Sequence, residues 1–205
     1  MKKYLLFLIF TVALICMTSP ASALENPANY YMVKIGIYAP SKSYNLNNFN
    51  SGSTTHLDSK SGINGEVAMG HYFLPVFAVE LGSGFFESKG SPAAEPGSAR
   101  LKVVPVLATA KVFLPVSPGR IELYGEFGIG AYFTKYEVND NLGSFSTSSE
   151  ITYGVHSGVG VNFNITDDVF LGVEGRYRLA TQPSFGGQKI PLDGFTTTVA
   201  VGFRF

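Results

Sequence analysis

The chain has 205 residues, with 15 lysines and arginines against 15 aspartates and glutamates, so its formal net charge is zero. This balance offers no basic surface, and we expect no nucleic-acid partner. Glycine (23 residues) and aromatic residues (14%) are abundant, while no long stretch repeats with the helical period, which favours many strands joined by turns.

The first predicted element is a secretory signal peptide over residues 1–23. Two lysines precede an apolar stretch at 4–17, and an Ala-Ser-Ala site ends at Ala23. The stretch is shorter than the about 20 apolar residues of a transmembrane helix, as is typical of a cleaved signal. We therefore expect secretory export, cleavage after Ala23 and one mature domain, residues 24–205.

The only cysteine, Cys16, lies inside this predicted signal. It follows Ile15, whereas a lipidation site has a small residue there. The mature chain therefore has no thiol for a disulfide, a nucleophile or a cysteine-metal site. We expect no cofactor.

Apolar and other residues alternate with a period of two along the mature chain. The clearest case is the C-terminal segment, where the apolar odd positions from Phe195 to Phe205 share one face and Arg204 lies on the other. This pattern predicts eight strands, at 30–39, 63–73, 76–87, 101–113, 120–136, 151–163, 169–179 and 193–205.

Long and short connections alternate strictly between these strands. This is typical of a closed eight-stranded antiparallel up-and-down transmembrane β-barrel, an all-β fold with long external loops and short periplasmic turns. A soluble lipocalin-like barrel is the competing prediction. Glycines on the polar faces favour the membrane barrel, because they suit a narrow polar lumen. These glycines are Gly70, Gly82, Gly84, Gly128, Gly130, Gly154, Gly158 and Gly160.

With the polar faces inside, the lumen collects charges of both signs that nearly balance. The candidate lumen charges are Lys34, Glu66, Glu80, Glu122, Glu126, His156, Glu174, Arg176, Arg178 and Arg204. They either line a water path or pair with one another and block it. A paired network is favoured because unpaired charge in a confined lumen is costly. We expect Glu126, Glu174, Arg176 and Arg178 at its centre.

Aromatic residues near the segment ends predict interfacial girdles. They are Tyr30, Tyr31, Tyr72, Phe73, Phe113, Tyr136, Phe163, Phe203 and Phe205.

The segment 101–113 departs from the alternation because it is apolar on both faces for most of its length. If Lys111 points inward, so do Val103, Pro105 and Leu107. Pro105 cannot donate to a ladder, which indicates a local opening or bend in the wall. The apolar side chains either pack against interior glycines or form a path for a small apolar solute that enters from outside and leaves sideways through the wall.

Four motifs follow one another as in small outer-membrane barrels of the OmpW-like group, which this sequence resembles. They are AVELGSGFF at 78–86, VVPVLATAKVF at 103–113, YGEFGIGAYF at 124–133 and the terminal GFRF. The resemblance implies an outer membrane of the Gram-negative type, surrounding lipid, and a narrow, partly apolar passage for small hydrophobic solutes. It also implies that Phe203 and Phe205 form the terminal signal read by the barrel-assembly machinery.

Catalytic and metal sites find little support in the sequence. His156 and Ser157 are adjacent, so they point to opposite faces of one strand and cannot share a proton. His56 and Asp58 supply only two potential metal ligands in a loop. We predict a non-enzymatic channel for passive uptake or efflux; the alternative is an occluded structural or surface-interaction barrel whose external loops, especially 40–62, bind a partner.

Overall fold

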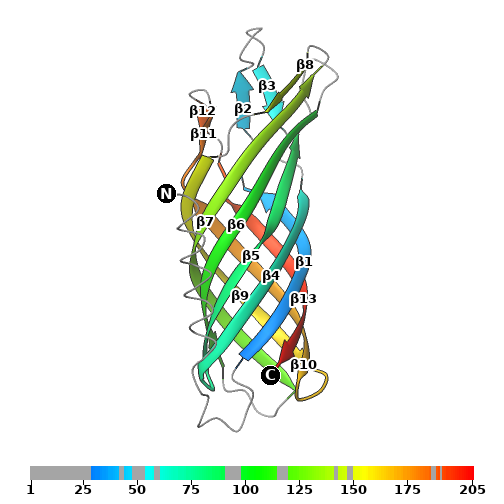
Figure 1. Cartoon of the computed structure of the whole chain (residues 1–205), viewed down its shortest axis with the longest axis vertical. Coiled ribbons are helices and arrows are strands. Elements are labelled where there is room, and N and C mark those ends of the chain that lie inside the picture. The colour runs from blue at the N-terminus through cyan, green and yellow to red at the C-terminus, as the bar shows by residue number, and fades with distance from the viewer. Residues whose placement is uncertain are drawn as a thin grey trace.

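A computed structural model describes residues 29–41, 44–47, 54–57, 61–90, 98–114, 120–140, 143–146, 150–185, 188–189 and 191–205. The predicted signal peptide and its cleavage site lie outside these residues. Eight long antiparallel strands form the wall of a barrel (Figure 1). They are β1 (Asn29–Pro40), β4 (Gly62–Leu74), β5 (Phe77–Gly90), β6 (Ser98–Phe113), β7 (Ile121–Asp140), β9 (Glu150–Asn164), β10 (Val169–Ala180) and β13 (Gly194–Arg204).

The wall is closed, with the strand order β6-β5-β4-β1-β13-β10-β9-β7 and a further pairing of β6 with β7. The first and last wall strands pair over their whole length, from Tyr30 opposite Arg204 to Pro40 opposite Gly194. A closed ladder leaves no unpaired edge, which a barrel in lipid requires. The predicted closed eight-stranded antiparallel barrel is confirmed, with strand boundaries within a few residues of those expected.

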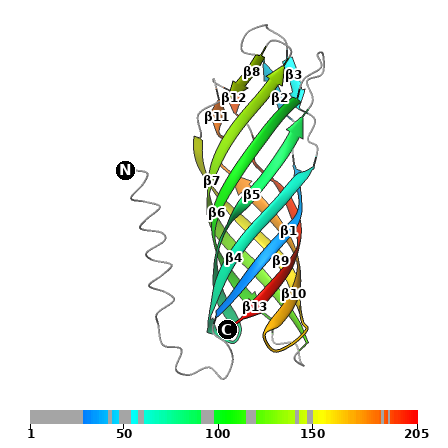
Figure 2. The same cartoon turned by 45° about the vertical axis from the view of Figure 1, so that its right-hand side comes forward.

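Five short strands lie in segments that the sequence predicts to be loops. They are β2 (Tyr44–Asn47), β3 (Thr54–Leu57), β8 (Gly143–Ser146), β11 (Ser184–Phe185) and β12 (Gln188–Lys189). At four residues or fewer, they are too short to show an alternation. All five lie at one end of the barrel, here called the loop end, whereas the C-terminus lies at the opposite, turn end (Figure 2). Among the described residues, no helix is long and apolar enough to cross a membrane.

The outer face of the wall is apolar and the inner face is mainly polar. In β13 every even-numbered residue is buried and every odd-numbered residue from Phe195 onward is exposed. Ile35 and Val159 on the outer face are 62% and 70% exposed. A soluble barrel would bury such side chains, so this arrangement excludes the lipocalin-like alternative.

Inward glycines leave room for inward aromatic rings. Tyr30, Tyr124 and Phe170 are each paired across the ladder with a glycine. A Cβ added at any of these three glycines, Gly70, Gly160 or Gly202, would overlap the partner's ring. Two of the glycines predicted to line a narrow lumen, Gly70 and Gly160, therefore make room for large side chains inside it.

The predicted interfacial positions of Tyr30, Tyr72 and Phe113 are wrong. Tyr30 and Phe113 are buried inside the barrel, and Tyr72 packs against both. Their positions in the strands share the face of lumen residues such as Lys34 and Lys111, so strand alternation directs them inward. Nearness to a strand end does not indicate whether a residue faces the lumen or the lipid.

Candidate functional site

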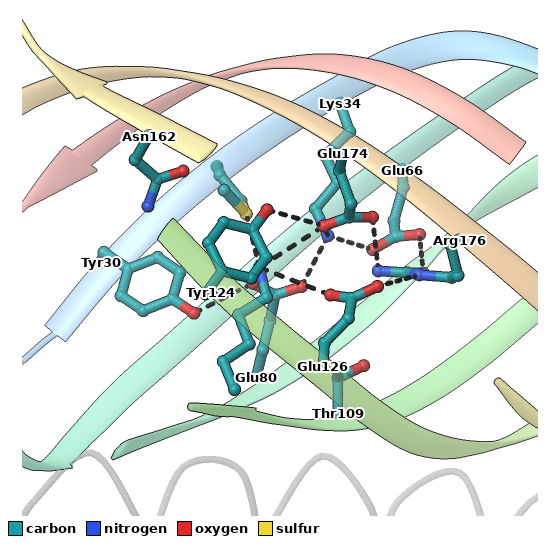
Figure 3. A network of polar contacts seen from close by, with 12 residues as sticks. Tyr30, Lys34, Glu66, Glu80, Thr109, Tyr124, Glu126, Asn162, Glu174 and Arg176 are labelled. Atoms are coloured by element: carbon teal, nitrogen blue, oxygen red, sulfur yellow. Dashed lines mark hydrogen bonds and ion pairs between the residues drawn. The ribbon is translucent and has the colours of Figure 1, made fainter. Parts of the chain in front are cut away.

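The interior of the barrel contains three layers. An apolar layer at the turn end consists of Tyr30, Met32, Ala68, Ala78, Phe113, Tyr124, Phe170 and Ala200. Above it lies the charge network, formed by Lys34, Glu66, Glu80, Lys111, Glu126, Glu174 and Arg176 (Figure 3). The loop-end cluster, Tyr38, Phe86, Leu101, Val103, Leu107, Tyr132 and Leu192, forms the third layer.

Two lysines join the carboxylates of the charge network. Lys34 Nζ contacts three of them: Glu80 at 2.7 Å, Glu66 at 3.0 Å and Glu174 at 3.1 Å. Lys111 Nζ lies 2.7 Å from Glu80 Oε2, so Glu80 bridges the two lysines. Both lysines also have a glutamate directly opposite on the neighbouring strand, Glu66 for Lys34 and Glu126 for Lys111. Strand register therefore brings opposite charges together.

Arg176 links the remaining carboxylates. Its Nε lies 2.7 Å from Glu126, its Nη1 2.9 Å from Glu66 and its Nη2 2.8 Å from Glu174. Each nitrogen of the guanidinium thus faces a different acidic residue, and the ion pairs join β10 to β4 and β7. Such a network holds its members in one arrangement, because a charge left unpaired in a low-dielectric interior is expensive.

The charge network fills the lumen at the middle of the barrel. Its ion-paired side chains are at most 4% exposed. The layer below adds two hydroxyl contacts, from Tyr30 to Glu80 at 3.0 Å and from Tyr124 to Glu174 at 3.1 Å. Apolar and charged side chains together leave almost no exposed side-chain surface in the described interior at this depth.

The structure places all ten candidate lumen charges on the inward face, but not all of them in one network. Arg204 pairs with Glu122 at 2.7 Å near the turn end. His156 lies above the network, with its Nε2 2.9 Å from the hydroxyl of Thr109. Ser157 is exposed on the outer face, which separates it from the imidazole of His156.

Arg178 is not at the centre of the network, where the sequence analysis had placed it. Its guanidinium lies among the rings of the loop-end cluster instead, 4.2 Å from the ring centroid of Phe86. Lys111, which is not among the ten predicted lumen charges, belongs to the network instead. The sequence predicts its inward direction only conditionally, whereas the pairing of β6 with β7 places it directly opposite Glu126.

Two pairings of the β5–β6 ladder are missing beside Pro105, one of the three residues predicted to form an apolar path, although the register is the same on both sides. Val103, Pro105 and Leu107 all face inward and are buried. The β5–β6 register runs from Phe77 to Ser83, then resumes at Phe86, leaving Gly84 and Phe85 without paired partners on β6. Ser83 donates its hydroxyl to the carbonyl of Pro105 at 3.0 Å. Because the N and O of a strand residue point to the same side, the missing N–H of Pro105 faces this interruption.

The interruption lies next to the apolar interior and near the upper limit of the apolar outer face. Phe85 and Val104 on the outside are 52% and 46% exposed. Two positions beyond them, Glu87 and Lys102 are paired across the ladder and also face outward. The unpaired positions therefore have the loop-end cluster on their inner side and the apolar outer face on their outer side. They lie on the turn-end side of the first outward charges of these strands.

Phe203 and Phe205, predicted to form the assembly signal, lie on the outer face at the turn end. The ring of Phe205 stacks on that of Tyr31. The backbone of Phe205 exchanges two hydrogen bonds with Asn29, of 2.9 and 3.2 Å. The last residue thus takes part in the seam that closes the barrel. Asp58 of the two-residue metal candidate lies outside the described residues.

Comparison with known proteins places this architecture in a family. The outer membrane protein beta-barrel domain matches residues 9–205, whereas no curated protein matches the sequence. OprG from Pseudomonas aeruginosa is 13% identical, with a TM-score of 0.59, over 88% of this chain and 97% of that one. E. coli outer membrane protein W is 14% identical, with a TM-score of 0.50, over 89% of this chain and all of that one.

A third solved structure has a similar fold. Ail, the attachment invasion locus protein of Yersinia pestis, solved with the heparin analogue sucrose octasulfate, is 17% identical, with a TM-score of 0.50, over 87% of this chain and 99% of that one. At these identities the likeness establishes the fold alone. The family match covers almost the whole chain, and this chain belongs to the family of outer membrane protein beta-barrel domains.

Proposed function

We propose that this protein admits small hydrophobic solutes across the outermost part of the outer membrane and releases them sideways into the lipid. The loop end faces the exterior, and a solute enters the loop-end cluster from there. It leaves between β5 and β6, beside Pro105. Export through the secretory pathway and assembly by the barrel machinery precede this function, and no catalytic step belongs to it.

The observation that carries the proposal is the interrupted ladder between Ser83 and Phe86. It lies against buried apolar residues on the inside and exposed apolar residues on the outside. Backbone hydrogen bonds elsewhere hold the strands together, and an apolar solute has no means of replacing them. Beside Pro105 the strands stay in register but lack one backbone donor, so separating them here breaks fewer hydrogen bonds than elsewhere.

The charge network supports a sideways exit over a straight one. An apolar solute that moved on toward the turn end would have to separate Lys34, Lys111 and Arg176 from their carboxylates. Breaking a buried ion pair costs about 3–5 kcal/mol. The wall opening requires no such separation.

Two measurements test this function. Cells producing the protein are exposed to 1-N-phenylnaphthylamine, an apolar dye that fluoresces on reaching lipid, and the refolded protein is recorded in planar bilayers. We expect faster dye uptake than in cells lacking the protein and no sustained ionic conductance. Equal dye uptake with and without the protein would contradict the proposal, as would a stable ion-conducting pore.

The same closed network also supports a second function, an occluded barrel whose loop end binds a partner. The short strands β2, β3 and β8 extend the loop end beyond the closed wall (Figure 1). Replacing residues 42–60 by a short Gly-Ser linker distinguishes the two functions. Under lateral passage dye uptake persists in this variant; under partner binding the cellular phenotype disappears with the loop.

A further inference from the structure

Among the described residues, Arg178 is a buried cation without an anionic partner. The described strands direct five lysines and arginines inward, and four of them, Lys34, Lys111, Arg176 and Arg204, form ion pairs with glutamates. Arg178 is 1% exposed, and its Nε and Nη1 have no hydrogen-bond partner among the described residues. Burying unsatisfied donors on a charged group is costly. Two nitrogens of this guanidinium therefore lack an acceptor among the described residues.

Aromatic rings surround this guanidinium. Its Cζ lies 4.2 Å from the ring centroid of Phe86, 5.5 Å from that of Tyr132 and 5.7 Å from that of Tyr38. Cation–π attraction favours such a position for a cation. A ring face is nevertheless a poor substitute for the oxygen acceptors that guanidinium N–H groups normally bind. The hydroxyl of Tyr132 is also buried; it lies next to the guanidinium of Arg178 but makes no hydrogen bond of good geometry in the described part of the chain. Arg178 and Tyr132, two neighbouring residues, thus both have hydrogen-bond donors that are not fully used.

The rest of the surroundings is apolar and firmly held. Val103, Leu107 and Leu192 are at most 1% exposed. The hydroxyl of Tyr38 donates to the carbonyl of Leu192 at 3.0 Å, which fixes the segment before β13 against the cluster. These side chains are closely packed, so a molecule that binds here must displace some of them; it would then meet unsatisfied donors at one point and apolar side chains around the rest of its surface.

We propose that Arg178 anchors a binding site for a small organic monocarboxylate with an apolar body. The carboxylate accepts hydrogen bonds from Arg178 and Tyr132, and the body packs within the loop-end cluster. A planar guanidinium matches a carboxylate with two parallel hydrogen bonds. The neighbouring charge network has four carboxylates for three cations, and its repulsion restricts the site to singly charged ligands.

This inference deepens the proposed function and rests on it for its role in transport: it names small apolar carboxylic acids as the solutes that the loop-end cluster prefers. The binding step itself requires only the site. Binding and passage are therefore measured separately.

Binding is measured by isothermal titration calorimetry on the mature protein in nanodiscs of zwitterionic lipid, with benzoate as the probe and empty nanodiscs as the blank. We expect saturable 1:1 binding of benzoate and weaker binding of benzyl alcohol, its neutral analogue. Arg178→Gln should weaken benzoate binding about 10- to 100-fold, the effect of losing charge-assisted hydrogen bonds. It should leave benzyl alcohol binding unchanged.

Two variants control for indirect effects. Arg204→Gln removes another inward arginine, which is paired with Glu122 at the turn end, and should leave the benzoate affinity within about twofold. Arg178→Lys keeps the charge but lacks the forked donors, and should lie between the wild type and Arg178→Gln. Because Arg178 forms no ion pair with any described residue, neither substitution at this position should prevent folding.

The outcomes separate this inference from the proposed function. Absence of saturable benzoate binding by the wild type, or equal affinity in Arg178→Gln, would overturn the site even if the apolar dye still enters cells. If benzoate binding depends on Arg178 but the protein does not speed dye uptake, the binding site is supported and lateral passage is contradicted.

Discussion

Phe205 stacks on Tyr31, with ring centroids 4.9 Å apart and ring planes 13° apart. The two residues come from opposite ends of the barrel sequence and meet at its closing seam. A stacked pair of this kind contributes about 0.5–1.5 kcal/mol beyond the area it buries. We therefore infer that the ring of Phe205 helps to close the barrel, a role separate from the assembly signal predicted for it.

Phe205→Ala should reduce the amount of folded barrel in the outer membrane severalfold, because it removes both the stacking and the aromatic terminus. The measurement is the fraction of protein that migrates as the compact form in unheated electrophoresis. Phe205→Tyr keeps the ring and should assemble normally. Equal assembly of wild type and Phe205→Ala would contradict both roles of this residue.

Arg176→Gln should destabilise the barrel by about 3–5 kcal/mol, since three buried carboxylates lose their shared cation. The free energy of unfolding in urea, measured in lipid vesicles, checks this value. Arg120→Gln is the control because Arg120 is exposed at the turn end, where a surface change is expected to cost less than about 0.5 kcal/mol.

The same two variants test whether the network also blocks ions. Arg176→Gln should give measurable conductance in planar bilayers, whereas the wild type and Arg120→Gln should remain closed. An Arg176→Gln barrel with unchanged stability and no conductance would show that the network neither supports the barrel nor closes it.

Gly160→Ala should cost about 1–3 kcal/mol of unfolding free energy, because the added Cβ overlaps the ring of Tyr124 in a packed interior. Gly125 in the neighbouring strand is the matched control. A Cβ at Gly125 meets no atom within 4 Å, so Gly125→Ala should be neutral or slightly stabilising. Similar losses in both variants would indicate a backbone effect and contradict the role of Gly160 in seating the ring.

The alternation of residues predicted most of the fold because a barrel strand has two chemically different faces. The pattern around Thr196 and Arg204 identified both the strand and its inward face, and the structure agrees. Short strands such as β8 remained hidden, since four residues carry too little periodicity. Tyr30 and Phe113 were misplaced because nearness to a strand end was given more weight than the face on which each residue lies.

The sequence predicts which charged residues face the interior but not which of them contact one another. Alternation directs Arg176 and Arg178 to the same side, yet one meets three carboxylates and the other meets three aromatic rings. Their environments depend on the stagger between strands, which places Phe86 and Tyr132 at the height of Arg178. Single-strand patterns contain no information on that stagger, and it is fixed only when all eight strands are paired.

The central claim, sideways release beside Pro105, is tested most directly by Pro105→Ala. Alanine supplies an N–H that faces Gly84 and can extend the β5–β6 ladder across the interruption. Pro40→Ala, which changes a proline of β1 away from the interruption, is the control. We predict that Pro105→Ala slows 1-N-phenylnaphthylamine uptake severalfold in cells with equal amounts of folded barrel, while Pro40→Ala does not. Wild-type uptake by a folded Pro105→Ala barrel would contradict the account.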